Sequence, residues 1–133
     1  MTAESKPRTG VVEWCDLTVP NADVLRDFYE SVVGWRSEDV AMNEYNDYAM
    51  SSPATGKTVA GICHDRGPNA KLPPQWLIYI VVEDVDASAG KCVELGGEVV
   101  DGPRDMGGGR FCVIRDPAGA VCALFRGPEF TDS

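Results

Sequence analysis

The sequence predicts an α+β domain made of two tandem βαβββ modules, and three observations support this fold class. Each half of the chain shows a strand-like run, one helical pattern and then three short strand-like runs. Residues that start or end these elements recur at a single offset of 63 residues. The length of 133 residues suits one domain. The duplication therefore accounts for nearly the whole chain.

The first module, residues 11–64, begins with the strand Val11–Val19, which is rich in β-branched and apolar residues. Asn21 is the expected helix N-cap, because its side-chain carbonyl can accept an amide of the first turn. Apolar residues then follow at helical spacing: Val24, Leu25, Phe28 and Val32. Gly34 should end the helix, since glycine tolerates a positive φ. The three predicted strands that follow are Trp35–Ser37, Tyr45–Ser51 and Thr58–Cys63.

The second module, residues 75–126, follows a linker at 65–74 that contains proline and glycine. Trp76–Val82 is the predicted strand, and Asp84 or Asp86 should cap a helix that runs to about Leu95. The remaining predicted strands are Glu98–Asp101, Arg110–Arg115 and Ala120–Phe125. The turn of the last hairpin is predicted at Asp116-Pro117-Ala118-Gly119. This order repeats that of the first module.

Four pairs of structural landmarks coincide at the 63-residue offset: Val19 with Val82, Asn21 with Asp84, Gly34 with Gly97, and Gly56 with Gly119. They mark a strand end, a helix cap, a helix end and a hairpin turn. Such an internal repeat is typical of units that bury faces against each other. An ordinary α+β domain without duplication is the alternative interpretation.

The charge balance excludes several classes of partner. The chain has 12 Lys and Arg against 21 Asp and Glu, a net charge of −9. Nucleic acids and anionic membranes require clustered basic surfaces, whereas a neutral or cationic small molecule suits this charge. The longest apolar run, Leu77–Val82, is too short to span a bilayer. Because the N-terminus is polar and has no apolar signal region, a cytoplasmic location is expected.

The five cysteines are predicted to be structural thiols: Cys15, Cys63, Cys92, Cys112 and Cys122. An odd number without a C-x-x-C pair argues against a disulfide framework and against a zinc knuckle. Most of them lie in β-like apolar runs, where free cysteine behaves as a small hydrophobic residue. The chain has one histidine, His64, which limits the composition of any metal site.

Four sequence segments resemble a known family: Asp16–Pro20, Phe28–Trp35, Val82–Ala87 and Asp116–Gly119. Together they resemble the vicinal oxygen chelate superfamily, which includes glyoxalase I, bleomycin-resistance proteins, extradiol dioxygenases and methylmalonyl-CoA epimerase. The resemblance covers about Val11 to Arg126 and is strongest to glyoxalase-like proteins of unassigned function. It implies a curved eight-stranded cup with the helices outside, and a homodimer.

The resemblance also implies a divalent metal held by side chains on four strands. Carried over to this chain, the four ligand positions are Trp14, Ala60, Leu77 and Ala123. None of these side chains supplies a carboxylate, imidazole or thiolate ligand. No metal cofactor is therefore expected. A one-residue shift would bring Glu13 or Cys122 into register, but it would also turn those strands over.

Alternation along the strands predicts a largely apolar and aromatic pocket in place of the metal. The predicted ligand-binding residues are Trp14, Asp16, Tyr48, Ile62, Leu77, Tyr79, Arg110, Phe111, Ala123 and Phe125. Each polar or aromatic member also has an ordinary structural interpretation. Asp16 can bond a backbone amide, Tyr79 can be a half-buried aromatic residue, and Trp14 can be part of the core.

Two functional hypotheses from different classes follow. The first is metal-independent binding of a small organic molecule, cationic or aromatic in character. The second is an enzyme of the lyase, isomerase or dioxygenase type that uses Asp16, His64 or Tyr79 as acid or base, or a metal from a shifted site. For His64, a solvated position at the end of its strand is the simpler expectation. A regulatory or dimer-forming module is a third interpretation.

Overall fold

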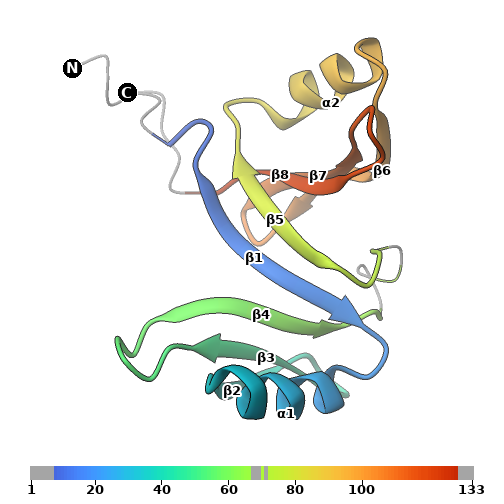
Figure 1. Cartoon of the computed structure of the whole chain (residues 1–133). Helices are drawn as coiled ribbons and strands as arrows, with labels where there is room; N and C mark the ends of the chain where they lie inside the picture. The colour runs from blue at the N-terminus through green and yellow to red at the C-terminus, as the bar shows by residue number, and fades with distance from the viewer. Residues whose placement is uncertain (1–7, 67–69, 71, 129–133) are drawn as a thin grey trace, which may run out of the picture. The chain divides into compact units, whose positions relative to one another are not determined.

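The computed structural model describes residues 8–66, 70 and 72–128, and the chain divides into two compact units. The first unit is Trp14–Trp76, and the second combines the residues up to Glu13 with those from Leu77 onward. The described residues contain eight strands and two helices in the order βαβββ, βαβββ (Figure 1). This order confirms the predicted α+β class and the two modules. Neither described helix is both long and apolar enough to cross a membrane.

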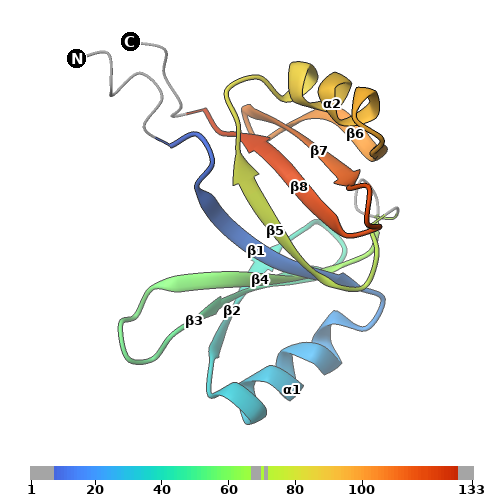
Figure 2. The same cartoon turned by 45° about the horizontal axis from the view of Figure 1, so that its top comes forward.

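The first unit contains one helix and a four-stranded mixed sheet. Its elements are β1 (Val12–Val19), α1 (Ala22–Val33), β2 (Arg36–Ala41), β3 (Asn46–Ser51) and β4 (Thr58–His64). The strand order is β2-β3-β4-β1, with β4 parallel to β1 and the other neighbours antiparallel. Helix α1 covers one face of this sheet (Figure 2). The core beneath it consists of Leu17, Val19, Ala22, Tyr48, Met50 and Ile62.

Both ends of α1 were predicted, but only one is capped as expected. Gly34 has a left-handed φ of 88° and its N–H donates to the carbonyl of Glu30. The side chain of Asn21 makes no capping hydrogen bond, so its expected role is wrong although the helix begins after it. Of the apolar positions at helical spacing, Leu25 packs on the core. The other three, Val24, Phe28 and Val32, are at least half exposed.

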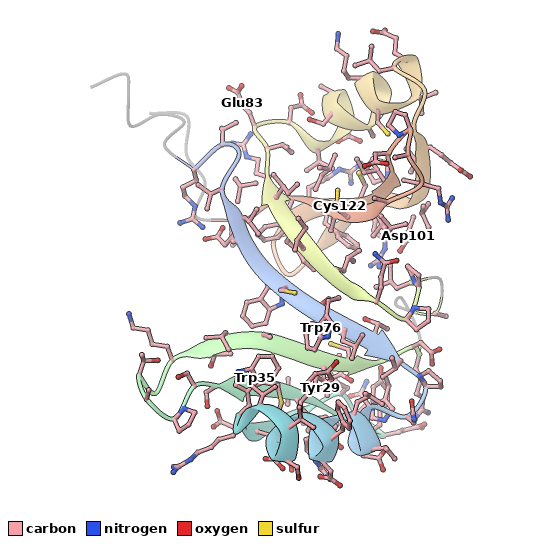
Figure 3. The ribbon with its side chains drawn as sticks, in the orientation of Figure 1. Tyr29, Trp35, Trp76, Glu83, Asp101 and Cys122 are labelled. Atoms are coloured by element: carbon pink, nitrogen blue, oxygen red, sulfur yellow. The ribbon has the colours of Figure 1, made fainter. Side chains whose placement is uncertain are left out.

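Three aromatic side chains form a cluster on the helix side of the sheet in the first unit. Tyr29 of α1 lies 5.2 Å from Trp76 and 5.8 Å from Trp35, measured between ring centroids. The indole Nε1–H of Trp76 donates to the hydroxyl of Tyr29 over 3.0 Å. The three rings gather beside α1 in Figure 3. Since edge-to-face aromatic pairs stabilise beyond their buried area, this cluster fixes α1 on its sheet.

The second unit repeats the same plan. Its elements are β5 (Trp76–Val81), α2 (Val85–Glu94), β6 (Glu98–Met106), β7 (Gly109–Arg115) and β8 (Val121–Arg126). The strand order is β5-β8-β7-β6, and only β5 and β8 are parallel. Asp84 caps α2 as predicted, because its Oδ1 accepts the N–H of Ala87 over 3.0 Å. The core beneath α2 consists of Val85, Ala89, Cys112 and Leu124.

The predicted hairpin turn is confirmed in detail. Asp116 Oδ1 accepts the N–H groups of Ala118 and Ala120, and Gly119 has φ 94°. Two strands extend well beyond their predicted ends, β2 to Ala41 and β6 to Met106. The polar strand β2 has little alternation to detect, and β6 continues through a proline and a glycine that usually interrupt strands. Residues 67–69 and 71 of the predicted linker lie outside the described residues.

Candidate functional site

The register of β4 corrects the face expected for Ile62 and places Tyr48 with it. Asp16 pairs with Gly61 and Leu17 pairs with Ile62. Because paired residues on neighbouring strands share a face, Ile62 lies with Leu17 beneath α1 and not with Trp14. Tyr48 pairs with Ile62 and lies in the same core. These two residues belong to the helix side of the first unit.

The cause is a one-residue difference between the modules. In the second unit Tyr79 pairs with Ala123, whereas in the first unit the equivalent Asp16 pairs with Gly61. The offset is therefore 62 residues for β4 and β8, although it is 63 for β1 and β5. Gly61, and not Ala60, is the structural counterpart of Ala123. A one-residue slip of this kind moves every side chain of a strand to the other face.

The sheet face of the first unit opposite α1 carries Trp14, Asp16 and Gly61, which we term the Trp14 face. The indole Nε1–H of Trp14 donates to Asp16 Oδ2 over 3.3 Å. A Cβ atom placed on Gly61 would lie 3.3 Å from Trp14 Cζ2 and 3.3 Å from Asp16 Cβ. Both Trp14 and Asp16 are partly exposed. The missing side chain of Gly61 thus makes room for an ordered indole that solvent can reach.

Two further polar groups lie on the same side of this sheet. Cys63 pairs with Thr18 and therefore shares the face of Asp16. Burial raises the pKa of the Cys63 thiol well above its usual range, and the nearby carboxylates of Asp16 and Asp47 oppose its ionisation further. Asp47 is buried, with 6% of its surface exposed, and sequence reasoning missed it. Its place in the alternating segment Asn46–Ser51 is the only signal that could have found it.

Asp47 also positions the single histidine. The backbone N–H of His64 donates to Asp47 Oδ1 over 2.9 Å, and His64 Nδ1 lies 3.5 Å from the same oxygen. The imidazole lies edge-on to Tyr45, with ring centroids 5.3 Å apart, and its side chain is only 15% exposed. His64 is therefore an ordered and mostly buried group, which corrects the expectation of a solvated histidine.

The second unit brings five predicted residues together on the sheet face opposite α2, which we term the Tyr79 face. Tyr79 pairs with Ala123, and Phe111 pairs with Phe125. The ring of Tyr79 lies 6.1 Å from Phe111, nearly parallel to it, and 6.3 Å from Phe125, edge to face. Leu77 belongs to the same face by strand alternation. All of these except Phe125 are buried.

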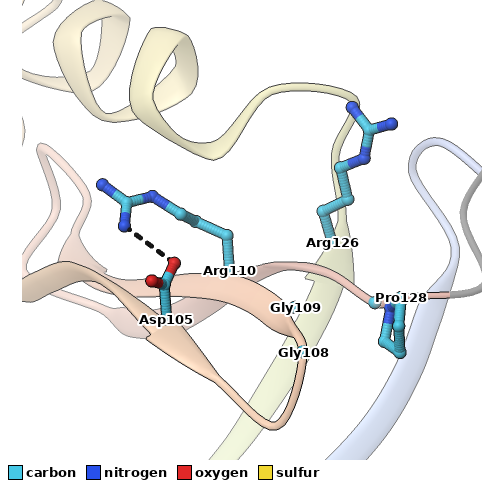
Figure 4. A pocket seen from close by; sticks show the side chains of 7 residues that line it. Asp105, Gly108, Gly109, Arg110, Arg126 and Pro128 are labelled. Carbon is cyan, nitrogen blue, oxygen red and sulfur yellow. Dashed lines mark hydrogen bonds and ion pairs between the residues drawn. The ribbon is translucent and has the colours of Figure 1, made fainter.

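Arg110 does not join the Tyr79 face as predicted. Its Nε and Nη2 donate to the two carboxylate oxygens of Asp86 over 2.9 Å each, and its Nη1 donates to Asp105 over 3.1 Å. The bidentate contact lowers the pKa of Asp86. Arg110 instead lines an open pocket of about 330 Å³ near Gly108 and Arg126 (Figure 4). Arg110 pairs with Arg126, and alternation places both on the α2 side of the strands.

Comparison with known proteins decides the family. The profile of the family described as "Glyoxalase/Bleomycin resistance protein/Dioxygenase superfamily" matches residues 11–124. The chain belongs to this superfamily. The resemblance seen in the sequence motifs is therefore confirmed, and the superfamily is that of the vicinal oxygen chelate proteins.

Relatives of this superfamily protein include longer proteins. It is 34% identical over 128 residues to a Mycobacterium bovis protein named "Putative glyoxylase CFP32", covering 95% of this chain and 49% of the relative. It is 32% identical over 130 residues to "Anthracycline biosynthesis protein DnrV" of Streptomyces peucetius, covering 88% of this chain and 47% of the relative. The chain thus spans about half the length of these curated relatives.

Solved structures of methylmalonyl-CoA epimerases share the fold of this superfamily protein. A complex of the epimerase with methylmalonyl-CoA and NH4+ matches with a TM-score of 0.58 at 17% identity, covering 94% of this chain and 99% of that chain. A substituted form of the Streptomyces coelicolor epimerase, in complex with 2-nitronate-propionyl-CoA, gives a TM-score of 0.57 at 17% identity, with 91% and 96% covered. At this level of identity the likeness shows the fold alone.

The residues of this superfamily protein do not fit the metal that the resemblance implied. With the observed register, the four positions are Trp14, Gly61, Leu77 and Ala123. An indole, a hydrogen atom and two aliphatic groups offer no ligand atom to a divalent cation. Among the described residues, no group of three or more His, Cys, Asp or Glu is arranged to hold a metal ion.

Proposed function

We propose that this superfamily protein binds a small organic molecule on its Trp14 face without using a metal. The observation that carries the proposal is the position of the Trp14 indole across Gly61. These two residues stand where the first module of the superfamily would present two metal ligands. An aromatic ring therefore occupies the place of ligand atoms.

The local geometry suits a flat or cationic ligand. The hydrogen bond to Asp16 and the contact with Gly61 hold the indole in one orientation before a ligand arrives. A preorganised ring loses little conformational entropy on binding, which favours affinity. The π face of tryptophan attracts cations, and at low ionic strength the net charge of −9 adds long-range attraction. An aromatic amine combines both features.

The comparisons support a small-molecule ligand in general terms. One relative is named as a glyoxylase and another as an anthracycline biosynthesis protein, and the epimerase structures hold CoA esters. All three names refer to small organic molecules. Each activity belongs to the protein that bears the name.

A second candidate function, an enzyme, is favoured by the Asp47–His64 pair. The buried Asp47 carboxylate lies 3.5 Å from His64 Nδ1, which brings together two side chains able to exchange a proton. Asp16 and Tyr79 are the other candidate acid–base groups. Turnover of a bound compound that is lost in both Asp16→Asn and His64→Ala would establish the enzyme in place of the binder.

We also propose that the protein is cytoplasmic and forms a homodimer. All five cysteines are free thiols, which agrees with a reducing compartment. The molar mass measured by light scattering after size exclusion tests the dimer: about twice 14.3 kDa supports it, and 14.3 kDa rejects it.

Metal analysis and a ligand titration test the binding function. Protein purified without chelator should contain no stoichiometric Ni, Mn, Fe or Zn. Titration with benzylamine, benzyl alcohol and benzoate should quench tryptophan fluorescence for at least one compound, and Trp14→Phe should abolish that response. Trp35→Phe is the matched control, since Trp35 packs on the helix side of the first unit. A tightly bound metal, or an unchanged titration in Trp14→Phe, would overturn the proposal.

A further inference from the structure

An arginine that the sequence patterns did not single out lies on the Tyr79 face. Arg104 of β6 pairs with Phe111 of β7, and its Cζ atom lies 4.4 Å from the centroid of the Phe111 ring. Its Nη2 donates to Asp101 Oδ2 over 3.1 Å. The side chain of Asp101 is 9% exposed and that of Arg104 is 27% exposed. The guanidinium of Arg104 thus packs on the Phe111 ring, is held by Asp101 and remains partly accessible to solvent.

A β-bulge produces this arrangement. Asp101 pairs with Val113 and Arg104 pairs with Phe111, so three steps along β6 match two steps along β7. Val113 and Phe111 share a face, and the bulge therefore puts Asp101 and Arg104 on that same face. In a regular strand, residues three apart point to opposite faces. Bulges commonly re-aim side chains next to binding sites. Asp101 is labelled on β6 in Figure 3.

We propose that the Tyr79 face of the second unit is a separate site, where Arg104 binds an anionic oxygen of a small molecule; this inference rests on the proposal that the protein binds small organic molecules. The ligand class is an aromatic or apolar molecule that carries a carboxylate or phosphate group. The planar guanidinium has five N–H donors in a fork that matches such oxygens. Asp101 and Phe111 orient this fork, one by a hydrogen bond and the other by its ring face.

The overall acidity of the chain does not oppose this site. Charges more than about 8 Å apart are largely screened at physiological ionic strength. What decides local affinity is the group in contact with the ligand, and an anion next to Arg104 meets a guanidinium that is already ordered. The buried Asp101 neutralises part of its charge, so the expected selectivity for anions is moderate.

A purely structural role, in which Arg104 only covers Phe111, makes a different prediction. Covering a ring is a matter of contact area, so its loss would weaken the fold and affect all ligands equally. An anion site instead distinguishes ligands by charge. The test therefore compares benzoate with benzyl alcohol, which share the phenyl ring, and adds phenyl phosphate to separate carboxylate from phosphate recognition.

Binding is measured by NMR on labelled full-length protein, following the amides of Phe111 and Val113 on β7 and the indole N–H of Trp14. In Arg104→Gln the dissociation constant of benzoate should rise at least tenfold, while that of benzyl alcohol stays within twofold. Arg104→Lys keeps the charge without the planar fork and should give an intermediate value. Arg115→Gln, which removes an exposed arginine paired with Glu98, is the matched control and should change neither constant.

The outcomes separate this inference from the function on which it rests. Equal weakening of benzoate and benzyl alcohol in Arg104→Gln, or equal affinity of the two compounds for the wild type, overturns the anion site. If benzyl alcohol still shifts the Trp14 indole signal in that case, the proposed function stands alone. If Arg104→Gln does not fold, Arg104→Lys decides: a weaker but remaining preference for benzoate over benzyl alcohol supports the anion site, and an unchanged preference or an equal loss for both compounds overturns it. Phenyl phosphate binding in place of benzoate identifies phosphate as the recognised group.

Discussion

The indole of Trp14 lies across the backbone of Gly61, 3.3 Å from the point where a side chain would begin. The two residues come from parallel neighbours, β1 and β4, and the hydrogen bond from Trp14 to Asp16 sets the orientation of the ring. The indole and the glycine are thus coupled, because the Trp14 ring can take this position only if residue 61 has no side chain. This coupling is the structural basis of the Trp14 face.

Gly61→Ala should displace the Trp14 ring. The added Cβ would meet both Trp14 Cζ2 and Asp16 Cβ at 3.3 Å, which is closer than most real contacts. Overpacking of this kind costs about 1–3 kcal/mol. We expect a lower free energy of unfolding in urea and a shifted tryptophan emission maximum. Gly90→Ala is the control, because nothing lies within 4 Å of that helical position and alanine should stabilise α2 by about 0.5–1 kcal/mol. Similar emission spectra for Gly61→Ala and wild type would contradict the coupling.

Tyr29→Phe should destabilise the first unit by about 1 kcal/mol, because the partly buried Nε1–H of Trp76 loses its acceptor. The aromatic contacts of the ring remain in this variant. Urea unfolding measures the change. Tyr45→Phe serves as the comparison, since the ring of Tyr45 and not its hydroxyl makes its contacts, and its change should stay within about 0.5 kcal/mol. Equal effects of the two substitutions would argue against the Trp76 hydrogen bond.

Stability should fall as the pH rises from about 8.5 to about 11. Burial raises the pKa of Cys112 to about 11, whereas an unfolded thiol ionises near pH 8.5. Between these values the folded state holds a proton that the unfolded state has lost, so the free energy of unfolding decreases with pH. Burial shifts the pKa of Cys15, Cys63 and Cys122 in the same direction. Urea unfolding at several pH values should show a shallower decline in Cys112→Val, and identical slopes would refute the role of Cys112.

Arg110→Gln should raise the pKa of Asp86 towards its ordinary value near 3.9. Arg110 holds that pKa down through two hydrogen bonds to the Asp86 carboxylate. A lowered folded-state pKa contributes stability above the unfolded value, and this contribution disappears as the pH falls through the folded pKa. The substitution should therefore make stability less sensitive to acid. Carbon-detected NMR of the Asp86 carboxyl group checks the shift, with Arg115→Gln expected to leave it unchanged.

Most of the fold could be predicted because the residues that begin and end its elements act through local contacts. Gly34, Asp84 and Asp116 each fix an element boundary through their own backbone or side chain, and all three act as expected. Side-chain capping by Asn21 failed because residues of this type compete among several local hydrogen-bonding arrangements. Local chemistry thus indicates where an element begins more reliably than which bond holds it.

The site was predicted less well because it depends on register between strands far apart in sequence. Alternation grouped Tyr79, Ala123 and Phe125, and strand pairing places these three residues on one face. The same rule misplaced Ile62, because the offset between the modules changes from 63 to 62 in β4. Asp47 had only its place in the alternating segment Asn46–Ser51 as a signal, and Arg104 had none, since a bulge orients it. Such features arise from pairing, which no local pattern encodes.

Gly102→Ala should disrupt the bulge of β6. Gly102 has φ 86°, and an added Cβ would lie 3.0 Å from the carbonyl oxygen of Phe111 and 3.1 Å from the backbone nitrogen of Arg104. Gly34→Ala is the matched control, because its φ of 88° carries the same backbone strain but nothing lies within 4 Å. The free energy of unfolding of the Gly34→Ala control should fall by about 1–2 kcal/mol, because alanine disfavours a left-handed φ. In urea unfolding, Gly102→Ala should lower the free energy of unfolding clearly more than the control, since the backbone atoms that it meets cannot move aside. It should also disturb the NMR signals of Asp101 and Arg104. Equal losses in the two variants would show that the bulge relaxes freely and does not fix the Asp101–Arg104 pair.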